Sequence, residues 1–128
     1  MLVLYRWAQH REWFWPRKDS DNRTTGQLCW HNASLVQFVI ANVQKLLRSS
    51  PNATIVTVAQ EDNGKYCNDS EAQRIIVEEG TAGGPLLRAV NTIAQAIEQE
   101  FPQVSTTPYS ELFRFICVHN CLTQGRNL

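Results

Sequence analysis

Thr54-Ile-Val-Thr-Val-Ala59, followed directly by Gln60-Glu-Asp-Asn-Gly64, is the most informative segment of the sequence. Its first half is β-branched and apolar, which is typical of a short buried strand. Its second half changes at once to carboxylate and amide side chains. In parallel α/β folds, ligands bind at the carboxyl ends of the strands, on the loops that lead into the next helices. The segment therefore predicts a functional strand end, although a plain polar turn with its bend at Asn63-Gly64 fits the composition as well.

The segments on both sides of this strand alternate between helical and extended patterns. Helices are predicted over residues 34–48, 69–79 and 85–100, and shorter strands over 27–30 and from 104 onward. Asn32 or Ser34 is expected to cap the first helix, and Asp69 or Ser70 the second. Gly80 is expected to end the second helix. Such alternation predicts an α/β fold with parallel strands joined by helical crossovers, here about three strand–helix units.

The composition describes one ordinary globular domain. The chain has 128 residues, of which 43% are hydrophobic and 19% charged, so it is long enough for one domain and too short for two. Twelve basic and twelve acidic side chains give no net charge, which argues against nucleic acid or an anionic membrane as a partner. No apolar run approaches the ~20 residues of a membrane span. No cofactor is expected.

The four cysteines are scattered along the chain, at positions 29, 67, 117 and 121, and show no paired CxxC spacing. Neither a zinc site nor a disulfide framework is predicted from them. Cys117 and Cys121 would share one face of a helix, but two thiolates do not fill a tetrahedral metal site. We therefore expect no metal, and we interpret these two cysteines as apolar filling of the core.

Two features bear on the compartment in which the protein works. The apolar run that begins at Met1 is interrupted by Arg6, which is too early for a signal peptide. Four glycosylation sequons begin at Asn22, Asn32, Asn52 and Asn68. Asn52 lies in a predicted turn and is expected to be the best acceptor, whereas Asn32 and Asn68 look more like helix caps. The sequons favour a secreted or extracellular protein.

Four segments together resemble a known family. They are His10-Arg-Glu-Trp-Phe14, Gln27-Leu-Cys-Trp-His-Asn32, Val56-Thr-Val-Ala-Gln-Glu-Asp-Asn-Gly-Lys-Tyr-Cys67 and Glu79-Gly-Thr-Ala-Gly-Gly-Pro-Leu-Leu-Arg-Ala-Val-Asn91. The resemblance covers about residues 8–104. The family is a domain of unknown function found in large, mostly secreted proteins. It is regarded as a glycoside-hydrolase-like (β/α)8 barrel that is distantly similar to α-glucuronidases and hexosaminidases.

The resemblance implies a partial (β/α)8, or TIM-like, barrel that is a fragment of a glycoside hydrolase or of another carbohydrate-active barrel acting on glycans. Two alternatives remain: a carbohydrate-binding barrel without catalysis, and a truncated product without activity. The sequence departs from the family at two places. The family often has Cys-x-Cys-x-x-Cys where this chain keeps only Cys67, and it usually has asparagine at the position of Glu61.

The candidate site residues follow from the central segment and from the resemblance. A glycosidase needs two carboxyl groups facing each other across the sugar, ~5–9.5 Å apart, and adjacent Glu61 and Asp62 are not expected to form such a pair. Strand phase favours Glu61 as the inward side chain. The family pattern favours Asp62, which we prefer as a general acid or as the partner of a sugar hydroxyl. The residues expected to bind the sugar are Gln60, Asn63, Tyr66, His10, Glu12 and Trp30.

For two neighbouring residues a structural role is the commoner explanation. Trp30 belongs to a first stretch of 31 residues that is rich in tryptophan, and indoles are buried in cores more often than they stack on sugars. His31 precedes a predicted helix cap, which favours a structural role over a catalytic one.

The end of the chain departs from the resemblance. After Val104 the family continues as a strand, whereas here Ser105-Thr-Thr-Pro108 intervenes, and proline disfavours a central strand. We expect residues 1–104 to form the partial barrel and residues 105–128 a tail foreign to the fold, with a divergent helix over 110–121 as the alternative. A complete barrel takes ~250 residues. The remainder of the barrel would then be missing, which favours self-association, and the chain alone is expected to be inactive as a hydrolase.

Overall fold

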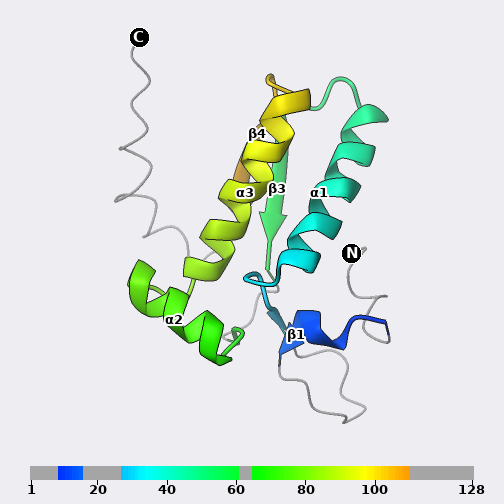
Figure 1. Cartoon of the computed structure of the whole chain (residues 1–128). Coiled ribbons are helices and arrows are strands. Elements are labelled where there is room, and N and C mark those ends of the chain that lie inside the picture. The colour runs from blue at the N-terminus through cyan, green and yellow to red at the C-terminus, as the bar shows by residue number, and fades with distance from the viewer. Residues whose placement is uncertain (1–8, 16–26, 61–64, 110–128) are drawn as a thin grey trace.

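The described part of the chain is a mixed α/β structure with three helices and short strands. The computed structural model describes residues 9–15, 27–60 and 65–109. Its elements are η2 (Arg11–Trp13), β1 (Phe14–Trp15), β2 (Gln27–Leu28), α1 (Ala33–Arg48), β3 (Ile55–Ala59), α2 (Ser70–Glu79), α3 (Gly84–Glu100) and β4 (Ser105–Tyr109). The three predicted helices and the central strand are confirmed to within one residue (Figure 1).

β3 and β4 form the parallel pair that the alternating pattern predicts. Their register places Ile55 opposite Ser105 and Ala59 opposite Tyr109, and α2 and α3 make the crossover between them. β4 begins directly after the expected boundary at residue 104, in the segment expected to be a tail, and contains Pro108. In the described residues β4 pairs with β3 alone, and a strand with one neighbour tolerates proline because half of its N–H groups make no ladder bond.

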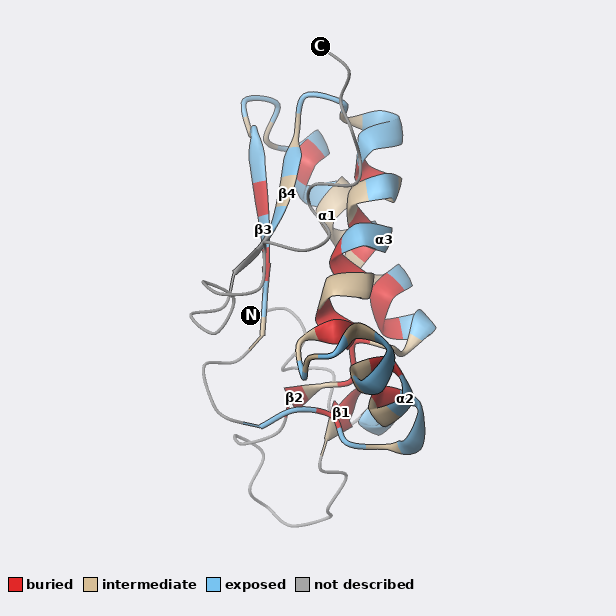
Figure 2. Ribbon diagram, turned by 90° about the vertical axis from the view of Figure 1, so that its left-hand side faces the viewer, coloured by how far each residue is buried: buried red, intermediate tan, exposed pale blue. Residues whose placement is uncertain are grey.

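The helices cover one face of this sheet. Figure 2 shows α1 and α3 on the same side of β3 and β4. Along β3, Val56 and Val58 are buried against the helices, while Ile55 on the other face is 64% exposed. The valines on the helix side confirm the strand phase on which the inward direction of Glu61 is predicted. The core between the two layers consists of Trp13, Phe14, Trp30, Leu35, Val36, Ile40, Leu47, Val56, Val58, Leu86, Ala89, Val90, Ile93 and Ile97.

The short strand near residue 27 does not join the parallel sheet. β2 pairs antiparallel with β1, with Phe14 opposite Leu28 and Trp15 opposite Gln27. The expectation of parallel strands is therefore wrong for this segment, because the chain before it returns as a neighbouring antiparallel strand. The described residues contain two separate two-stranded sheets and no closed barrel.

The turn between α2 and α3 requires glycine at two positions. Gly80 ends α2 with φ 70°, in the left-handed region that glycine adopts without strain. A Cβ at Gly84, the first residue of α3, would lie 2.7 Å from the Cβ of Glu79. The two helices can therefore meet this closely only with glycine at the start of α3. None of the helices in the described ranges is long and apolar enough to cross a membrane.

Candidate functional site

The carboxyl end of β3 is where the sequence places the site. Both views show that β3 ends beside the start of α1, near α2, β1 and β2 (Figures 1 and 2). Gln60 directly follows β3 and is half-buried, and Tyr66 is 42% exposed. Glu61, Asp62 and Asn63 lie outside the described residues, so the two catalytic candidates have no described position.

Two of the helices that start at this end are capped by side chains. The Oδ1 atom of Asn32 accepts hydrogen bonds from the backbone N–H groups of Ser34 and Leu35, at 3.0 and 3.2 Å. The Oδ1 atom of Asp69 accepts one from the N–H of Ala72 at 2.9 Å. In each case the structure selects the first of the two predicted caps. Helix N-termini carry a partial positive charge, so this end of the fold favours ligands with oxygen acceptors.

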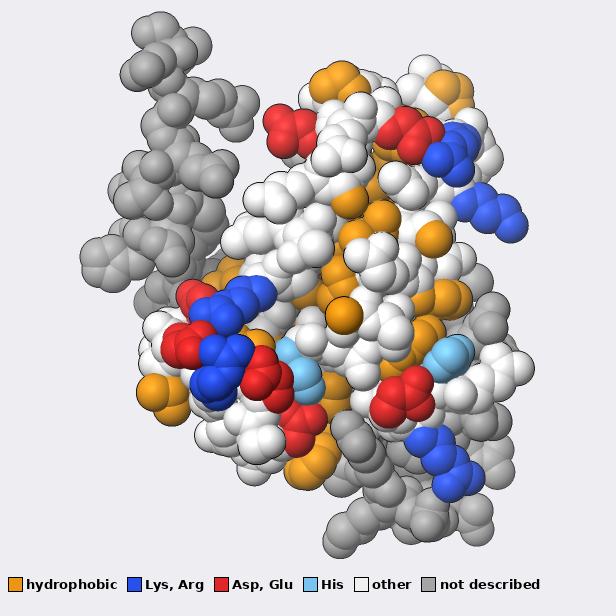
Figure 3. Space-filling view, viewed as in Figure 1, with side chains coloured by type: hydrophobic (Ala, Val, Ile, Leu, Met, Phe, Trp, Pro, Cys, Tyr) orange, Lys and Arg blue, Asp and Glu red, His pale blue; other side chains and the backbone are white. Residues whose placement is uncertain are grey.

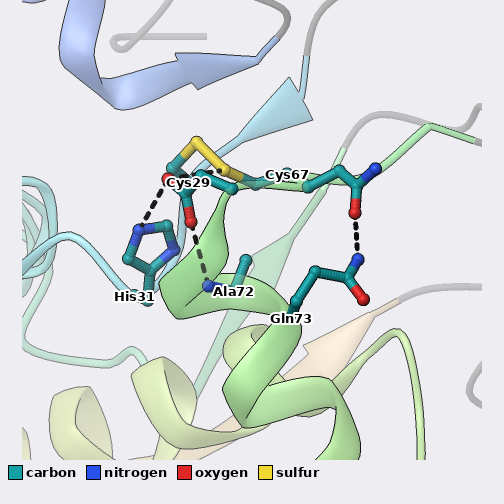
Figure 4. Close-up of a disulfide and its surroundings, with 7 residues drawn as sticks. Cys29, His31, Cys67, Ala72 and Gln73 are labelled. Atoms are coloured by element: carbon teal, nitrogen blue, oxygen red, sulfur yellow. Dashed lines mark hydrogen bonds and ion pairs between the residues drawn. A yellow bond between two sulfur atoms is a disulfide. The ribbon is translucent and has the colours of Figure 1, made fainter.

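A disulfide lies at the same end, which corrects the expectation that the cysteines form no disulfide framework. Cys29 and Cys67 are bonded, with their Cα atoms 5.1 Å apart and a sequence separation of 38 residues (Figure 4). Both residues are buried, and together with Ala72 they form a small apolar cluster. The pairing could not be predicted, because connectivity cannot be deduced from cysteine positions alone. The bond fixes the segment after β2 to the segment that leads into α2.

The imidazole of His31 contacts the carboxylate of Asp69 beside the disulfide. The Nε2 atom of His31 lies 3.1 Å from Oδ2 of Asp69, and their side chains are only 12% and 22% exposed. Since the same carboxylate caps α2, His31 holds the start of that helix in place. This contact agrees with a structural role for His31. Its Nδ1 atom is buried without a hydrogen-bond partner in the described part of the chain.

The disulfide also governs whether a metal could bind here. The Sγ atoms of Cys29 and Cys67 and a carboxylate oxygen of Asp69 lie within 4.8 Å of one another. Zinc is bound by thiolates, and the bonded sulfurs carry none. In the oxidised protein this group therefore offers a cation only the Asp69 carboxylate.

Two of the candidate sugar-binding residues, His10 and Glu12, lie beside Trp13. The His10 ring stacks on the Trp13 indole, with centroids 3.8 Å apart and an angle of 3° between the planes. The Nδ1 atom of His10 lies 3.0 Å from Oε1 of Glu12, and the indole N–H of Trp13 donates to the Ser34 hydroxyl at 2.7 Å. His10 and Glu12 are partly exposed, so both polar groups can reach a ligand. The structure brings these two candidates together on η2.

Trp30 differs from the other sugar-binding candidates because it is buried. Its side chain is 5% exposed and belongs to the core, so it presents no ring face on which a sugar could stack. Its indole Nε1 is buried without a hydrogen-bond partner among the described residues. Burial is the structural role that the tryptophan content favours.

Several exposed charged side chains pair with one another, on α2 and between the ends of α1 and α3. Figure 3 shows acidic and basic side chains gathered over α2, where Arg74 bridges Glu71 and Glu78. The hydrogen bond from Arg74 lowers the pKa of Glu71. Arg48 donates to both oxygens of Glu100 at 2.7 Å, and this bond lowers the pKa of the Glu100 carboxyl.

A hollow of about 170 Å³ lies at the opposite end of the sheet. Leu47, Pro51 and Phe101 are among its lining residues, and Arg48 is its charged member. Arg48 is already paired with Glu100, so the hollow offers few free polar groups. In α/β folds this amino-terminal end of the strands serves stability and the carboxyl end serves binding. We therefore place the candidate site at the carboxyl end of β3.

Comparison with known proteins identifies a family but no characterised relative. The family model described as domain of unknown function (DUF4838) matches residues 3–111. Neither the curated proteins nor the solved structures include a match to this chain.

Proposed function

We propose that this chain, which belongs to the family described as domain of unknown function (DUF4838), is part of a carbohydrate-active (β/α)8 barrel that binds a glycan at the carboxyl end of β3. The observation that carries the proposal is the parallel pairing of β3 with β4 across a helical crossover. That connection is the repeating unit of α/β barrels, whose binding groups lie where the strands end.

The polar groups at this strand end suit a sugar. The Gln60 amide can donate and accept hydrogen bonds, and the Tyr66 phenol, which is 42% exposed, can do both and also present a ring face. Asp62 would act as a general acid or bind a sugar hydroxyl, with Glu61 as the second carboxylate of the segment. Hydrolysis needs carboxyl groups on opposite sides of the sugar. We therefore expect the opposing group to come from a later strand of a complete barrel, and this chain alone to bind without hydrolysis.

The exposed face of β3 favours the view that further barrel strands are missing. Ile55 is 64% exposed, and Thr57 and Ala59 are exposed on the same face. In a closed barrel these side chains would fill the interior. An apolar face left open in this way favours association with a second copy.

The disulfide supports a secreted or extracellular location. Disulfides persist in oxidising compartments and are rare in the cytosol, and Cys29 is bonded to Cys67. This agrees with the sequons in the sequence.

A binding experiment tests the proposal. Residues 1–128 are applied to a glycan array, and the best ligand is titrated by calorimetry against wild type, Asp62→Ala and Gln60→Ala. We expect each substitution to weaken binding about 5- to 30-fold, because a hydrogen bond to a buried sugar hydroxyl contributes about 1–2 kcal/mol. Gln99→Ala, on the exposed far end of α3, is the matched control. Equal affinity in all four proteins would exclude this site, and no binding to any glycan would exclude the function.

A further inference from the structure

Three of the four sequons lie in the described residues, and they differ in what their side chains and backbone already do. Asn52 is exposed in the turn between α1 and β3, and Thr54, which supplies the sequon hydroxyl, is exposed as well. The turn is closed by the backbone, since the N–H of Ala53 donates to the carbonyl of Ser50 at 3.0 Å. The Asn52 side chain is therefore not required to hold the turn together. An exposed loop of this kind is where N-linked glycans are found.

The Asn32 side chain already takes part in the hydrogen bonds that cap α1. Its Oδ1 atom caps α1 through the N–H groups of Ser34 and Leu35. The Ser34 hydroxyl, which an acceptor sequon needs, donates to Asn32 Oδ1 and accepts from the indole of Trp13, both at 2.7 Å. A glycan here would compete with the helix cap and with the packing of a core tryptophan.

Asn68 and Ser70 are exposed as well, but the backbone of this sequon is restrained on both sides. Cys67 is in the disulfide and Asp69 caps α2, so the backbone around Asn68 is fixed. The side-chain Oδ1 atom of Asn68 accepts a hydrogen bond from the side-chain amide of Gln73. Asn22 lies outside the described residues.

We propose that Asn52 carries an N-linked glycan and that Asn32 and Asn68 carry less or none. The inference rests on the secretory route in the proposed function. The co-reactant is a polyisoprenyl diphosphate oligosaccharide. The Asn52 amide nitrogen forms a bond to the anomeric carbon of its first sugar, the bond from that carbon to the diphosphate oxygen breaks, and the amide loses a proton. Polyisoprenyl diphosphate is the leaving group, and nothing is oxidised or reduced.

The position of Asn52 keeps such a glycan away from the candidate ligand site. The turn lies at the end of the molecule opposite α2, β1 and β2, as Figures 1 and 2 agree. It adjoins the hollow, because the neighbouring Pro51 and Ala53 line it. The glycan would therefore cover the amino end of the sheet and leave the carboxyl end open.

Site mapping in translocated protein tests the inference. The full chain is expressed in animal cells behind a cleavable secretory leader and collected from the medium and the microsomes. Peptide N-glycosidase treatment in heavy-oxygen water converts each glycosylated asparagine to a labelled aspartate, which peptide mass spectrometry locates. We expect most of the label at Asn52. Asn52→Gln and Thr54→Ala should each lose one glycan, whereas Asn32→Asp, which keeps a capping oxygen, should lose none.

The outcomes distinguish a failure of the Asn52 glycosylation site from a failure of the proposed secreted location. An unlabelled Asn52, or labelling at Asn32 or Asn68 equal to that at Asn52, would overturn the inference. The same digests, run without reductant, report whether Cys29 and Cys67 are linked. A linked chain with unmodified Asn52 rejects the site and leaves the secretory proposal standing, while unlinked cysteines count against the secretory proposal itself.

Discussion

Removing the Cys29–Cys67 disulfide should lower the free energy of unfolding by about 4 kcal/mol. The bond joins cysteines 38 residues apart, and closing a loop of that length removes about 13 cal/mol/K of entropy from the unfolded chain. At ~25 °C this amounts to about 4 kcal/mol, a large part of the ~5–15 kcal/mol by which domains are stable. The Cα atoms are 5.1 Å apart, within the usual disulfide range of ~4.4–6.8 Å. The native backbone therefore needs no adjustment that would offset the gain.

Two comparisons separate the cross-link from the packing of the sulfur atoms. All proteins carry alanine at positions 117 and 121, so that no other thiol can exchange. Urea unfolding of the oxidised protein against the same protein reduced with a phosphine measures the cross-link alone. The Cys29→Ala/Cys67→Ala variant measures the cross-link together with the lost packing of two buried side chains, so its loss should be larger by about 1 kcal/mol. The midpoint of thermal unfolding should fall by roughly 10–20 °C.

Two results would contradict this reasoning. A difference below about 1 kcal/mol between oxidised and reduced protein would mean that the loop is constrained by other contacts in the unfolded chain. An oxidised protein in which a non-reducing peptide map finds no Cys29–Cys67 linkage would mean that the pairing itself is wrong.

Three further predictions concern the core, a helix cap and an ion pair. Ile97 is fully buried, so Ile97→Ala should cost about 2–5 kcal/mol in urea unfolding, whereas Gln99→Ala should change the stability by less than about 0.5 kcal/mol. Asn32→Ala should cost about 0.5–2 kcal/mol because α1 loses its cap, and Asn32→Asp should restore most of it; equal losses would exclude capping. The Glu100 pKa is lowered in the folded protein by the bond from Arg48, so its contribution is present above the unfolded pKa and is lost as the pH falls through the folded one. Thermal unfolding followed from about pH 5 to about pH 2 should therefore decline less steeply in Glu100→Gln than in wild type, by a small amount because both side chains are exposed.

The sequence predicts the local elements well because each has its own chemical signals. α3 is marked by its apolar face. Asn32 marks the start of α1, and Asp69 and Gly80 mark the start and the end of α2. The β-branched run from residue 55 marks the central strand. These signals act over a few residues, so one sequence is enough to detect them. The parallel pairing follows from the order of the elements and needs no further information.

Contacts between distant segments could not be predicted in the same way. The disulfide and the pair between His31 and Asp69 both connect the end of β2 to the start of α2. Nothing in the sequence around Cys29 indicates that Cys67 is its partner. The antiparallel pairing of β1 with β2 was missed for a similar reason, because two-residue strands carry no detectable alternation. The acidic candidates of the site, Glu61 and Asp62, lie outside the described residues, so their roles stay predictions.

β3 shows the clearest mismatch between a sequence and its surroundings. Every residue from Ile55 to Ala59 is apolar or β-branched, a composition typical of parallel strands that are buried on both faces. Only one face is buried here, by α1 and α3, through Val56 and Val58. Ile55 on the other face is 64% exposed, and burying such a side chain is worth about 1.5–3 kcal/mol. The strand therefore has the composition of one that is covered on its second face, as in a barrel closed by further strands or in contact with a second copy.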